Sequence, residues 1–159
     1  DQRFRYVRGG FMGQPNYTFV LDFKHPDIQK VTLGINESYL EDLLLAWAIG
    51  STSNSNTITL VRDRAMIGNG VGQQDRVGGC QLAINRAKGA NHQTVGAVAY
   101  SDSFFPFDDG PLVLRRAGVK IILATSGSVR DKDIQELCRR EGMTLLLLPD
   151  IEARGFYGH

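Results

Sequence analysis

The stretch GAVAYSDSFFPFDDGPLVLRRAGVKIILATSG, residues 96–127, decides the fold class of this 159-residue chain. It predicts in turn a buried strand, a helix and a second buried strand, at 96–100, 109–118 and 119–127. Both strands are almost entirely apolar, which is typical of a sheet covered on both faces. The rhythm continues with a helix over 131–142 and a last strand over 144–150. We therefore expect an α/β fold with three layers, α/β/α.

The preceding residues extend the same domain. Asn36 can cap a helix that Gly50 ends, and the runs 57–63 and 65–72 read as two strands joined by a tight Asp-Arg turn. Asp75 then caps another helix. The expected domain is therefore 36–159.

Residues 1–35 lack a helical pattern. Two strands are expected there, at 5–13 and 17–23, in a short N-terminal β segment that bridges to another domain. Because the chain opens at Asp1 in the middle of a strand-like run, we expect it to be part of a longer polypeptide.

Composition narrows the function classes. With 42% apolar residues and a net charge of +1, the chain reads as an ordinary soluble, cytoplasmic domain, without nucleic acid or membrane as a main partner. Cys80 and Cys138 each fall on the apolar face of an expected helix, which predicts buried, reduced thiols. The three histidines occur in no zinc-binding motif, so no zinc site is expected.

Three polar segments follow expected strands: GNGVGQQDR at 68–76, SDSFFPFDDG at 101–110 and TSGSVRD at 125–131. Ligands of open α/β sheets collect at the carboxyl ends of strands, so this rim is the expected binding site. The glycines of the first segment either admit another backbone or let a ligand approach, with Gln73, Gln74 and Arg76 in contact. The phenylalanines of the second either fill a pocket or hold a ligand.

The third segment places Ser128 and Asp131 at the spacing of a capping box, so a helix is expected to start there. The chain end, ARGFYGH at 153–159, is either a frayed terminus or a set of ligand contacts. Its Arg154 suits phosphate.

These segments, with the opening RYVRGGFMGQ and the helix ESYLEDLLLAWAIG, resemble the C-terminal half of a known family. That family is the formyltransferase domain of the bifunctional purine-biosynthesis enzyme, the AICAR transformylase that is fused to IMP cyclohydrolase. The resemblance implies a cytidine-deaminase-like fold without zinc. It also implies formyl transfer from 10-formyltetrahydrofolate to 5-aminoimidazole-4-carboxamide ribonucleotide, at sites formed in a homodimer.

The resemblance also implies roles for single residues. Asn56 would hold the substrate carboxamide, and Asp109 would face the folate pterin. The other expected substrate contacts are Gln74, Arg76, Phe104, Arg154, Phe156 and His159. Pro106 and Phe107 would pack along the folate. Some members hold a potassium ion, for which the local candidates are Ser53, Ser55, Thr57 and Asp102.

Two departures from the family leave alternatives open. Lys24 and His25 form a Lys-His pair like the catalytic pair of the family's first half, but they are followed by Pro-Asp-Ile-Gln instead of the family motif. The helical insertion of the family is shortened here to a linker. The chain is therefore either half of a formyltransferase, completed by a second half-domain, or a non-catalytic domain that binds purine nucleotide or folate or serves in dimerisation. Formate is the alternative formyl donor.

Overall fold

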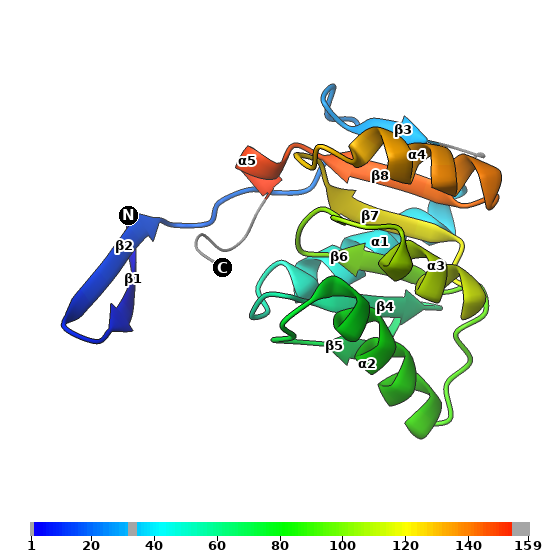
Figure 1. Ribbon diagram of the computed structural model, residues 1–159, viewed down its shortest axis with the longest axis horizontal. Coiled ribbons are helices and arrows are strands. Elements are labelled where there is room, and N and C mark those ends of the chain that lie inside the picture. Colours follow the sequence, from blue (N-terminus) through cyan, green and yellow to red (C-terminus); the bar gives the residue numbers. More distant parts are fainter. Residues whose placement is uncertain (1, 32–34, 154–159) are drawn as a thin grey trace.

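A mixed sheet of six strands forms the centre of the computed structural model, which describes residues 2–31 and 35–153 (Figure 1). The strand order across the sheet is β3-β8-β7-β6-β4-β5. The strands are β3 (Gln29–Val31), β4 (Ile58–Arg62), β5 (Ala65–Gly70), β6 (Val98–Ser101), β7 (Ile121–Thr125) and β8 (Thr144–Leu148).

Strand direction places several carboxyl ends at one edge of this sheet. β6, β7 and β8 are parallel, as expected from their fully buried, apolar sequences. β4 is antiparallel to both β5 and β6, so β5 runs in the same direction as β6. The loops that follow β5, β6, β7 and β8 therefore emerge at the same edge, and the loop that enters β4 meets them there.

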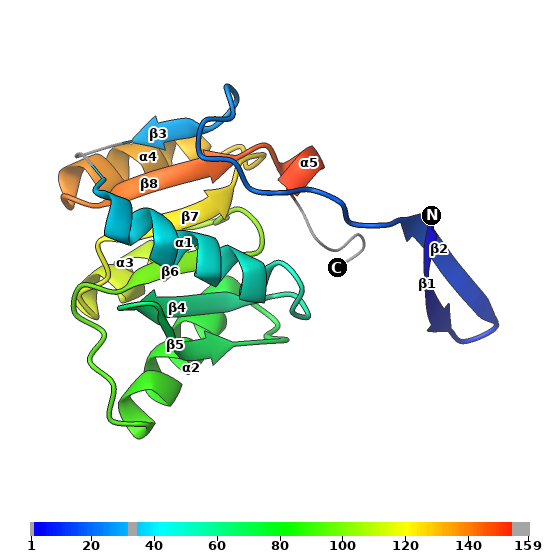
Figure 2. The ribbon, with the colours of Figure 1, turned by 180° about the vertical axis from the view of Figure 1, so that it is seen from behind.

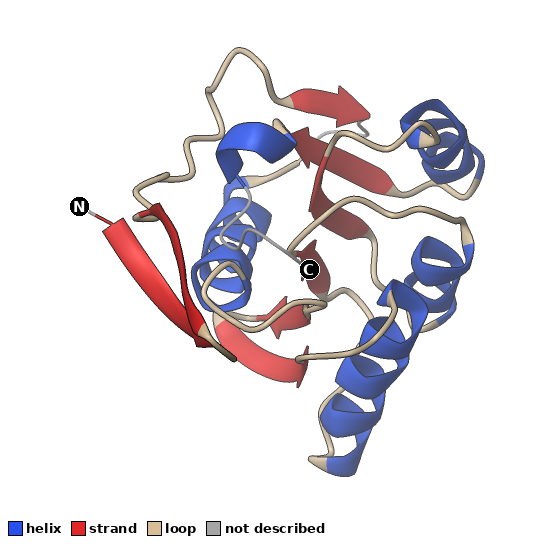
Figure 3. Ribbon diagram, turned by 60° about the vertical axis from the view of Figure 1, so that its left-hand side comes forward, coloured by secondary structure: helices blue, strands red, loops and turns tan. Residues whose placement is uncertain are grey.

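The helices lie on both faces of the sheet (Figures 2 and 3). They are α1 (Glu37–Gly50), α2 (Arg76–Gly89), α3 (Asp109–Arg116), α4 (Asp131–Arg140) and the short α5 (Asp150–Ala153). One core cluster joins the sheet to α2, α3 and α4 through Cys80, Leu114 and Ile134. A second joins the other face to α1 through Leu43 and Tyr100. The α/β class is as expected.

Local signals for helix starts are confirmed at two positions. The Asn36 side chain accepts a hydrogen bond from the Tyr39 N–H at the start of α1. The Asp75 carboxylate accepts one from the Gly78 N–H at 2.6 Å, which caps α2. The helix expected over 131–142 does begin at Asp131, as α4, but its N-cap residue is Arg130 and not Ser128.

The turn between β4 and β5 is the tight Asp-Arg turn that the sequence predicts. Asp63 and Arg64 both have positive φ, 52° and 60°, a conformation that non-glycine residues adopt at a cost. The buried Asp42 carboxylate accepts hydrogen bonds from the backbone N–H groups of both, at 3.1 and 2.7 Å. These two bonds stabilise the turn.

The N-terminal segment differs from expectation. The single strand expected at 5–13 is a hairpin of β1 (Gln2–Val7) and β2 (Gly10–Pro15), because the chain reverses at Gly9, where φ is 89°. Residues 17–23 form no strand, and β3, which the sequence pattern missed, pairs with β8. The sheet thus uses residues before position 36, and the division into 1–35 and 36–159 stays a prediction.

The hairpin projects from the domain at the end of an extended connection (Figure 1). Phe4, Tyr6 and Phe11 are 64%, 72% and 70% exposed, and the rings of Tyr6 and Phe11 pack edge to face with centroids 5.5 Å apart. A two-stranded ribbon is marginally stable in water by itself, and an exposed aromatic face of this kind is typical of an interaction surface.

Cys80 and Cys138 are buried free thiols, as expected. Burial raises the pKa of Cys80 to about 12 and that of Cys138 to about 11. Unfolded thiols ionise near pH 8.5, so between about pH 8.5 and 11 only the unfolded state loses these protons. The free energy of unfolding should therefore fall as the pH rises through this range.

The same shift predicts unreactive thiols, because the thiolate is the nucleophile. Iodoacetamide at pH 8.5 should leave both thiols of the folded chain unmodified and should alkylate both in concentrated guanidinium chloride, as measured by mass spectrometry. Rapid labelling of the folded chain would contradict the burial of these helix faces.

Among the described residues, no helix is both long and apolar enough to cross a membrane.

Candidate functional site

Seven of the ten predicted substrate and folate contacts line one hollow at the carboxyl edge of the sheet. Its volume is about 340 Å³. We call it the rim hollow, and its lining residues are Asn56, Gln74, Asp75, Arg76, Val77, Ser103, Phe104, Pro106, Phe107 and Asp109. These residues come from the loop before β4, the segment from β5 into α2, and the loop between β6 and α3. Two of the three segments that the sequence predicted for the rim thus meet here.

A pair of backbone bridges joins the loop before β4 to the segment after β5. The Asn56 N–H donates to the Gln73 carbonyl at 3.2 Å, and the Gln73 N–H donates to the Asn56 carbonyl at 3.1 Å. The Gly72 N–H donates to the Asn54 carbonyl at 3.0 Å. These bonds continue the contact between the two segments beyond the ends of β4 and β5 and bring Asn56 and Gln74 to one side of the hollow.

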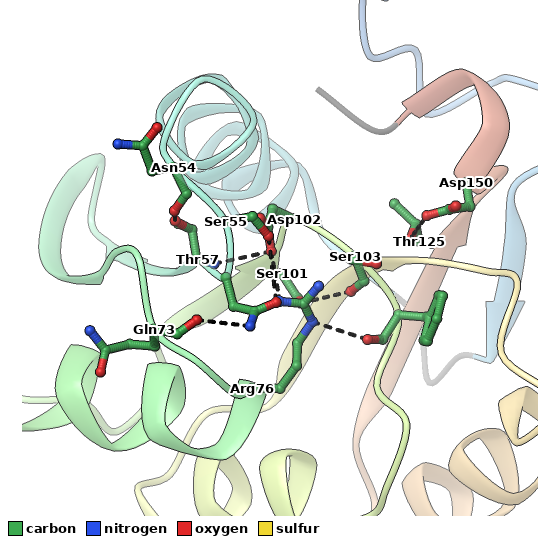
Figure 4. A network of polar contacts seen from close by, with 12 residues as sticks. Asn54, Ser55, Thr57, Gln73, Arg76, Ser101, Asp102, Ser103, Thr125 and Asp150 are labelled. Carbon is green, nitrogen blue, oxygen red and sulfur yellow. Dashed lines mark hydrogen bonds and ion pairs between the residues drawn. The ribbon is translucent and has the colours of Figure 1, made fainter. Parts of the chain in front are cut away.

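A buried ion pair joins Arg76, which lines the rim hollow, to Asp102, which does not (Figure 4). Arg76, the first residue of α2, lies 3.0 Å from Oδ1 of Asp102, which follows β6, and both side chains are 8% exposed. Arg76 Nε also donates to the Phe104 carbonyl at 3.1 Å. The Asp102 carboxylate accepts a further hydrogen bond from the Thr57 N–H at 3.1 Å. The pair therefore ties three segments together at the base of the site.

The Asn56 side chain is held at both of its polar atoms. Its Oδ1 accepts a hydrogen bond from Arg76 Nη1, and its Nδ2 donates to the Gln73 carbonyl at 2.8 Å. Oδ1 also accepts a hydrogen bond from the Ser55 hydroxyl at 3.4 Å, so one N–H of the Asn56 amide remains for a ligand.

The three phenylalanines of the 101–110 loop have different environments. Phe105 is 3% exposed and packs in the core, where its ring approaches Gly110. Phe104 and Pro106 are half-buried and line the rim hollow, and Phe107 is 57% exposed at its mouth. The Arg130 guanidinium lies 5.9 Å from the centroid of the Phe107 ring. One ring thus fills the core, and the other two offer apolar surface to a ligand.

Asp109 lies at the first turn of α3 and is exposed. Its Oδ1 accepts a hydrogen bond from the Gly110 N–H at 2.7 Å. The Asp109 side chain lines the hollow, and its carboxylate can accept further hydrogen bonds from a ligand.

Two of the three glycines at 68–72 allow α2 to pack closely on β5, and they do not serve the approach of a ligand. A Cβ at Gly68 would lie 2.2 Å from the Ala83 carbonyl oxygen, and one at Gly70 would lie 2.1 Å from that of Gly79, both on α2. Gly72 has φ of +69° and open space around its Cβ position. The first two glycines thus let α2 pack closely on β5, and Gly72 allows the turn toward Gln73.

Several predicted site residues do not join the rim hollow. Lys24 and His25 lie in the turn before β3, where the His25 Nδ1 accepts a hydrogen bond from the Asp27 N–H at 3.3 Å. They are not among the residues that line the hollow. Arg154, Phe156 and His159 lie outside the described residues. A catalytic role for Lys24 and His25 stays a prediction.

The potassium candidates are brought together only in part. Thr57 contacts Asp102, and its hydroxyl donates to the Asn54 carbonyl at 2.6 Å. The Ser53 hydroxyl donates to the Ile49 carbonyl at 2.9 Å, at the end of α1. The Ser55 hydroxyl donates to Asn56 Oδ1 at 3.4 Å. A potassium ion here stays a prediction.

Among the described residues, no three or more His, Cys, Asp or Glu side chains form a group that could hold a metal ion.

The rim hollow is better supplied for binding than for proton transfer. Of the described residues that line it, the side chains that could accept a proton are the carboxylates of Asp75 and Asp109. Asp75 is already engaged as the cap of α2. The arrangement offers hydrogen bonds, an apolar wall and one carboxylate to a ligand.

Sequence reasoning did not single out Val77 and Ser103 as lining residues. Val77 has the helical spacing of a core residue. Ser103 is 2% exposed, and the little surface that it has lines the hollow. The Gln73 contact with Asn56 is made by the Gln73 backbone, which no side-chain pattern could indicate.

A family model described as the AICARFT/IMPCHase bienzyme matches residues 1–86. The chain is 38% identical over 143 residues to the bifunctional purine biosynthesis protein PurH of Cutibacterium acnes, and this match covers 89% of the chain and 27% of that protein. It is 44% identical over 108 residues to PurH of Mycobacterium marinum, and this match covers 68% of the chain and 20% of that protein. The chain thus spans about a quarter of the length of these relatives or less.

Two solved structures share the fold. One is a diaminohydroxyphosphoribosylaminopyrimidine deaminase/5-amino-6-(5-phosphoribosylamino)uracil reductase of Thermotoga maritima, with a TM-score of 0.51 and 15% identity, covering 76% of this chain and 39% of that one. The other is RibD of Acinetobacter baumannii, with a TM-score of 0.50 and 16% identity, covering 74% and 38%. At these identities the likeness concerns the fold alone, and it agrees with the deaminase-like fold expected from the sequence.

Proposed function

The chain belongs to the AICARFT/IMPCHase bienzyme family, and from that premise we propose that it takes part in formyl transfer in purine biosynthesis. The reaction would move the formyl group of 10-formyltetrahydrofolate to the amino group of 5-aminoimidazole-4-carboxamide ribonucleotide. The chain would act as the C-terminal half, or as a short form, of the transformylase, with a three-layer, cytidine-deaminase-like domain. The observation that carries the proposal is the rim hollow, where side chains expected at this site lie together.

The lining residues suit two ligands placed side by side. On one side, the remaining N–H of Asn56 suits the oxygen of a carboxamide, with Gln74 and Phe104 beside it. On the other side, Pro106 and Phe107 form an apolar wall that suits a flat heterocycle. The Asp109 carboxylate lies at the end of this wall, where it can accept hydrogen bonds from the amino groups of a pterin.

The chemistry of formyl transfer needs a group that removes a proton from the attacking amine. Because the described lining of the rim hollow offers few such groups, we propose that the base comes from a second half-domain or from a second copy in a homodimer. The exposed aromatic face of the hairpin, formed by Phe4, Tyr6 and Phe11, supports assembly of this kind, since it is a surface for packing. Arg154, Phe156 and His159 are further proposed contacts of the nucleotide.

The same shortage of bases favours one second candidate. It is a non-catalytic domain of the family that binds purine nucleotide or folate, or that serves in dimerisation. Assaying formyl transfer with the purified chain separates the two. Turnover, either by the chain alone or after a second half-domain is added, supports the enzyme. Nucleotide binding without turnover in both cases favours the binding domain.

Replacing Asp109 by alanine should weaken folate binding at least tenfold, because one charge-assisted hydrogen bond contributes about 1.5–3 kcal/mol. Affinity for a 5-formyl or 10-formyl folate analogue can be measured by calorimetry, with circular dichroism to confirm the fold. Asp108→Ala is the matched control, since Asp108 is the adjacent exposed carboxylate and does not line the rim hollow. Equal folate affinity in Asp109→Ala and wild type would remove Asp109 from the folate site.

A further inference from the structure

The segment TSGSVRD at 125–131 was expected at the rim, but none of these seven described residues lines the rim hollow. It contacts the aromatic loop of the hollow instead. The Arg130 guanidinium lies 5.9 Å from the centroid of the Phe107 ring. A Cβ at Gly127 would lie 3.8 Å from Cδ1 of Phe104, so the same segment also passes beside this second ring.

Arg130 approaches the Phe107 ring from outside the rim hollow. It lines a separate hollow of about 330 Å³ beside α4, whose lining includes Asp108 and Ile134. Phe107 lines the rim hollow and is not among the described residues that line this second hollow. One part of the ring surface thus meets the guanidinium, and another part is left to a ligand.

The position of Arg130 is itself fixed by local contacts. Its backbone N–H donates to the Ser128 hydroxyl at 3.1 Å. The Asp131 carboxylate accepts hydrogen bonds from the N–H groups of Gly127 and Ser128, at 2.8 and 3.2 Å. Arg130 Nε lies 3.6 Å from the Asp133 carboxylate, one turn further along. The guanidinium is therefore presented to the ring by an ordered turn.

Phe107 needs such a support because it is 57% exposed at the mouth of the hollow. An exposed side chain that changes rotamer freely must be ordered when a ligand binds, and that ordering lowers affinity. A guanidinium over an aromatic ring is attracted by the negative face of the ring. The contact with Arg130 therefore favours one orientation of Phe107 before any ligand arrives.

We propose that Arg130 is a positioning residue that holds the Phe107 ring in the free protein and so preorganises the apolar wall of the rim hollow for a flat heterocycle. This inference rests on the proposed function, because the heterocycle would be that of the folate. The segment 125–131 thus acts on the ligand through Phe107.

The first test needs no ligand. In a chain with ¹³C-labelled phenylalanine rings, the Phe107 signal is assigned by its loss in Phe107→Leu. Carbon relaxation should show restricted motion of this ring in wild type and greater motion in Arg130→Gln, which removes the cation. The ring of Phe105, which is 3% exposed in the core, should be equally rigid in both. Equal motion of the Phe107 ring in both chains would overturn the proposal.

The second test is a double-mutant cycle on the affinity for 5-formyltetrahydrofolate, measured by calorimetry. Arg130→Gln should weaken binding about two- to fivefold, as expected for an exposed cation–π contact. It should have no effect in the Phe107→Leu background, because the ring through which it acts is gone. An unchanged affinity in Arg130→Gln would overturn the proposal. So would an effect that persists in Phe107→Leu, because Arg130 would then act on the ligand directly.

Arg140→Gln is the matched control. Arg140 lines the same second hollow and lies 3.6 Å from the Glu141 carboxylate, the same ion-pair distance as for Arg130, but at the other end of α4. It should leave the Phe107 ring motion and the folate affinity as in wild type. If it changed both as Arg130→Gln does, the cause would be the net charge of this surface and the proposal would fail.

Phe107→Leu alone separates failure of this proposal from failure of the proposed function. Wild-type folate affinity in folded Phe107→Leu, or no folate binding by wild type, refutes the proposed folate wall, and the ring-motion test still decides whether Arg130 positions Phe107. Weaker folate binding in Phe107→Leu together with unchanged binding in Arg130→Gln refutes the role of Arg130 alone.

Discussion

Replacing Arg76 by alanine is expected to lower the free energy of unfolding by about 3–5 kcal/mol, because it leaves the Asp102 carboxylate buried without its partner. In a domain of this length, such a loss lowers the melting temperature by roughly 10 °C. Arg76 also joins the Phe104 carbonyl to the Asn56 side chain, so nucleotide binding should be lost as well. Urea denaturation followed by circular dichroism measures the first effect, and calorimetry measures the second.

Arg64→Ala is the control for this change. Arg64 forms a shorter ion pair, 2.6 Å from Glu41, but the two side chains are 75% and 53% exposed. Exposed pairs of this kind contribute about 0–1 kcal/mol. If Arg76→Ala cost no more stability than Arg64→Ala, the Arg76–Asp102 pair would not hold the segments of the site together as we describe.

Replacing Gly70 by alanine is expected to cost about 3 kcal/mol, because the new Cβ would lie 2.1 Å from the Gly79 carbonyl oxygen and force α2 away from β5. The displacement would also move Gln74 and Arg76, which continue from β5 into α2, so binding should weaken with stability. Thermal unfolding and nucleotide titration of the same sample measure both effects.

Gly89→Ala provides the contrast. Gly89 is the last residue of α2, its φ is not in the left-handed region, and nothing lies within 4 Å of its Cβ position. Alanine there should raise the free energy of unfolding by about 0.5–1 kcal/mol. A loss of stability at Gly89 equal to that at Gly70 would mean that close packing of α2 on β5 is not the reason for the glycines at 68 and 70.

The parts of the fold that could be predicted are those with strong local signals. The strands β6, β7 and β8 are apolar throughout because they are buried on both faces, and Asn36 and Asp75 cap helices by contacts within four residues. The rim hollow lies at the edge expected from the rule that ligands of open α/β sheets collect at the carboxyl ends of the strands.

Other parts depend on contacts that no local pattern reveals. β3 is three residues long at the edge of the sheet, and two of those residues are exposed, so it has no apolar run. Asp102 is paired with Arg76 across 26 positions of sequence, and the resemblance marked Asp102 only as a potassium candidate, so this ion pair was not predicted. At the start of α4, the Asp131 carboxylate accepts hydrogen bonds from the Gly127 and Ser128 N–H groups, so the capping-box residues meet, but the N-cap residue is Arg130.

The central claim is that the rim hollow is where this chain binds the purine-precursor ribonucleotide. The measurement that tests it most directly is a titration of ¹⁵N-labelled chain with 5-aminoimidazole-4-carboxamide ribonucleotide, followed by backbone and side-chain amide shifts. We predict saturable changes concentrated at Asn56, Gln74 and Phe104. Changes that instead gather at the opposite edge of the sheet, in the hollow lined by Tyr39, Arg62 and Arg64, or no changes at saturating nucleotide, would contradict the account.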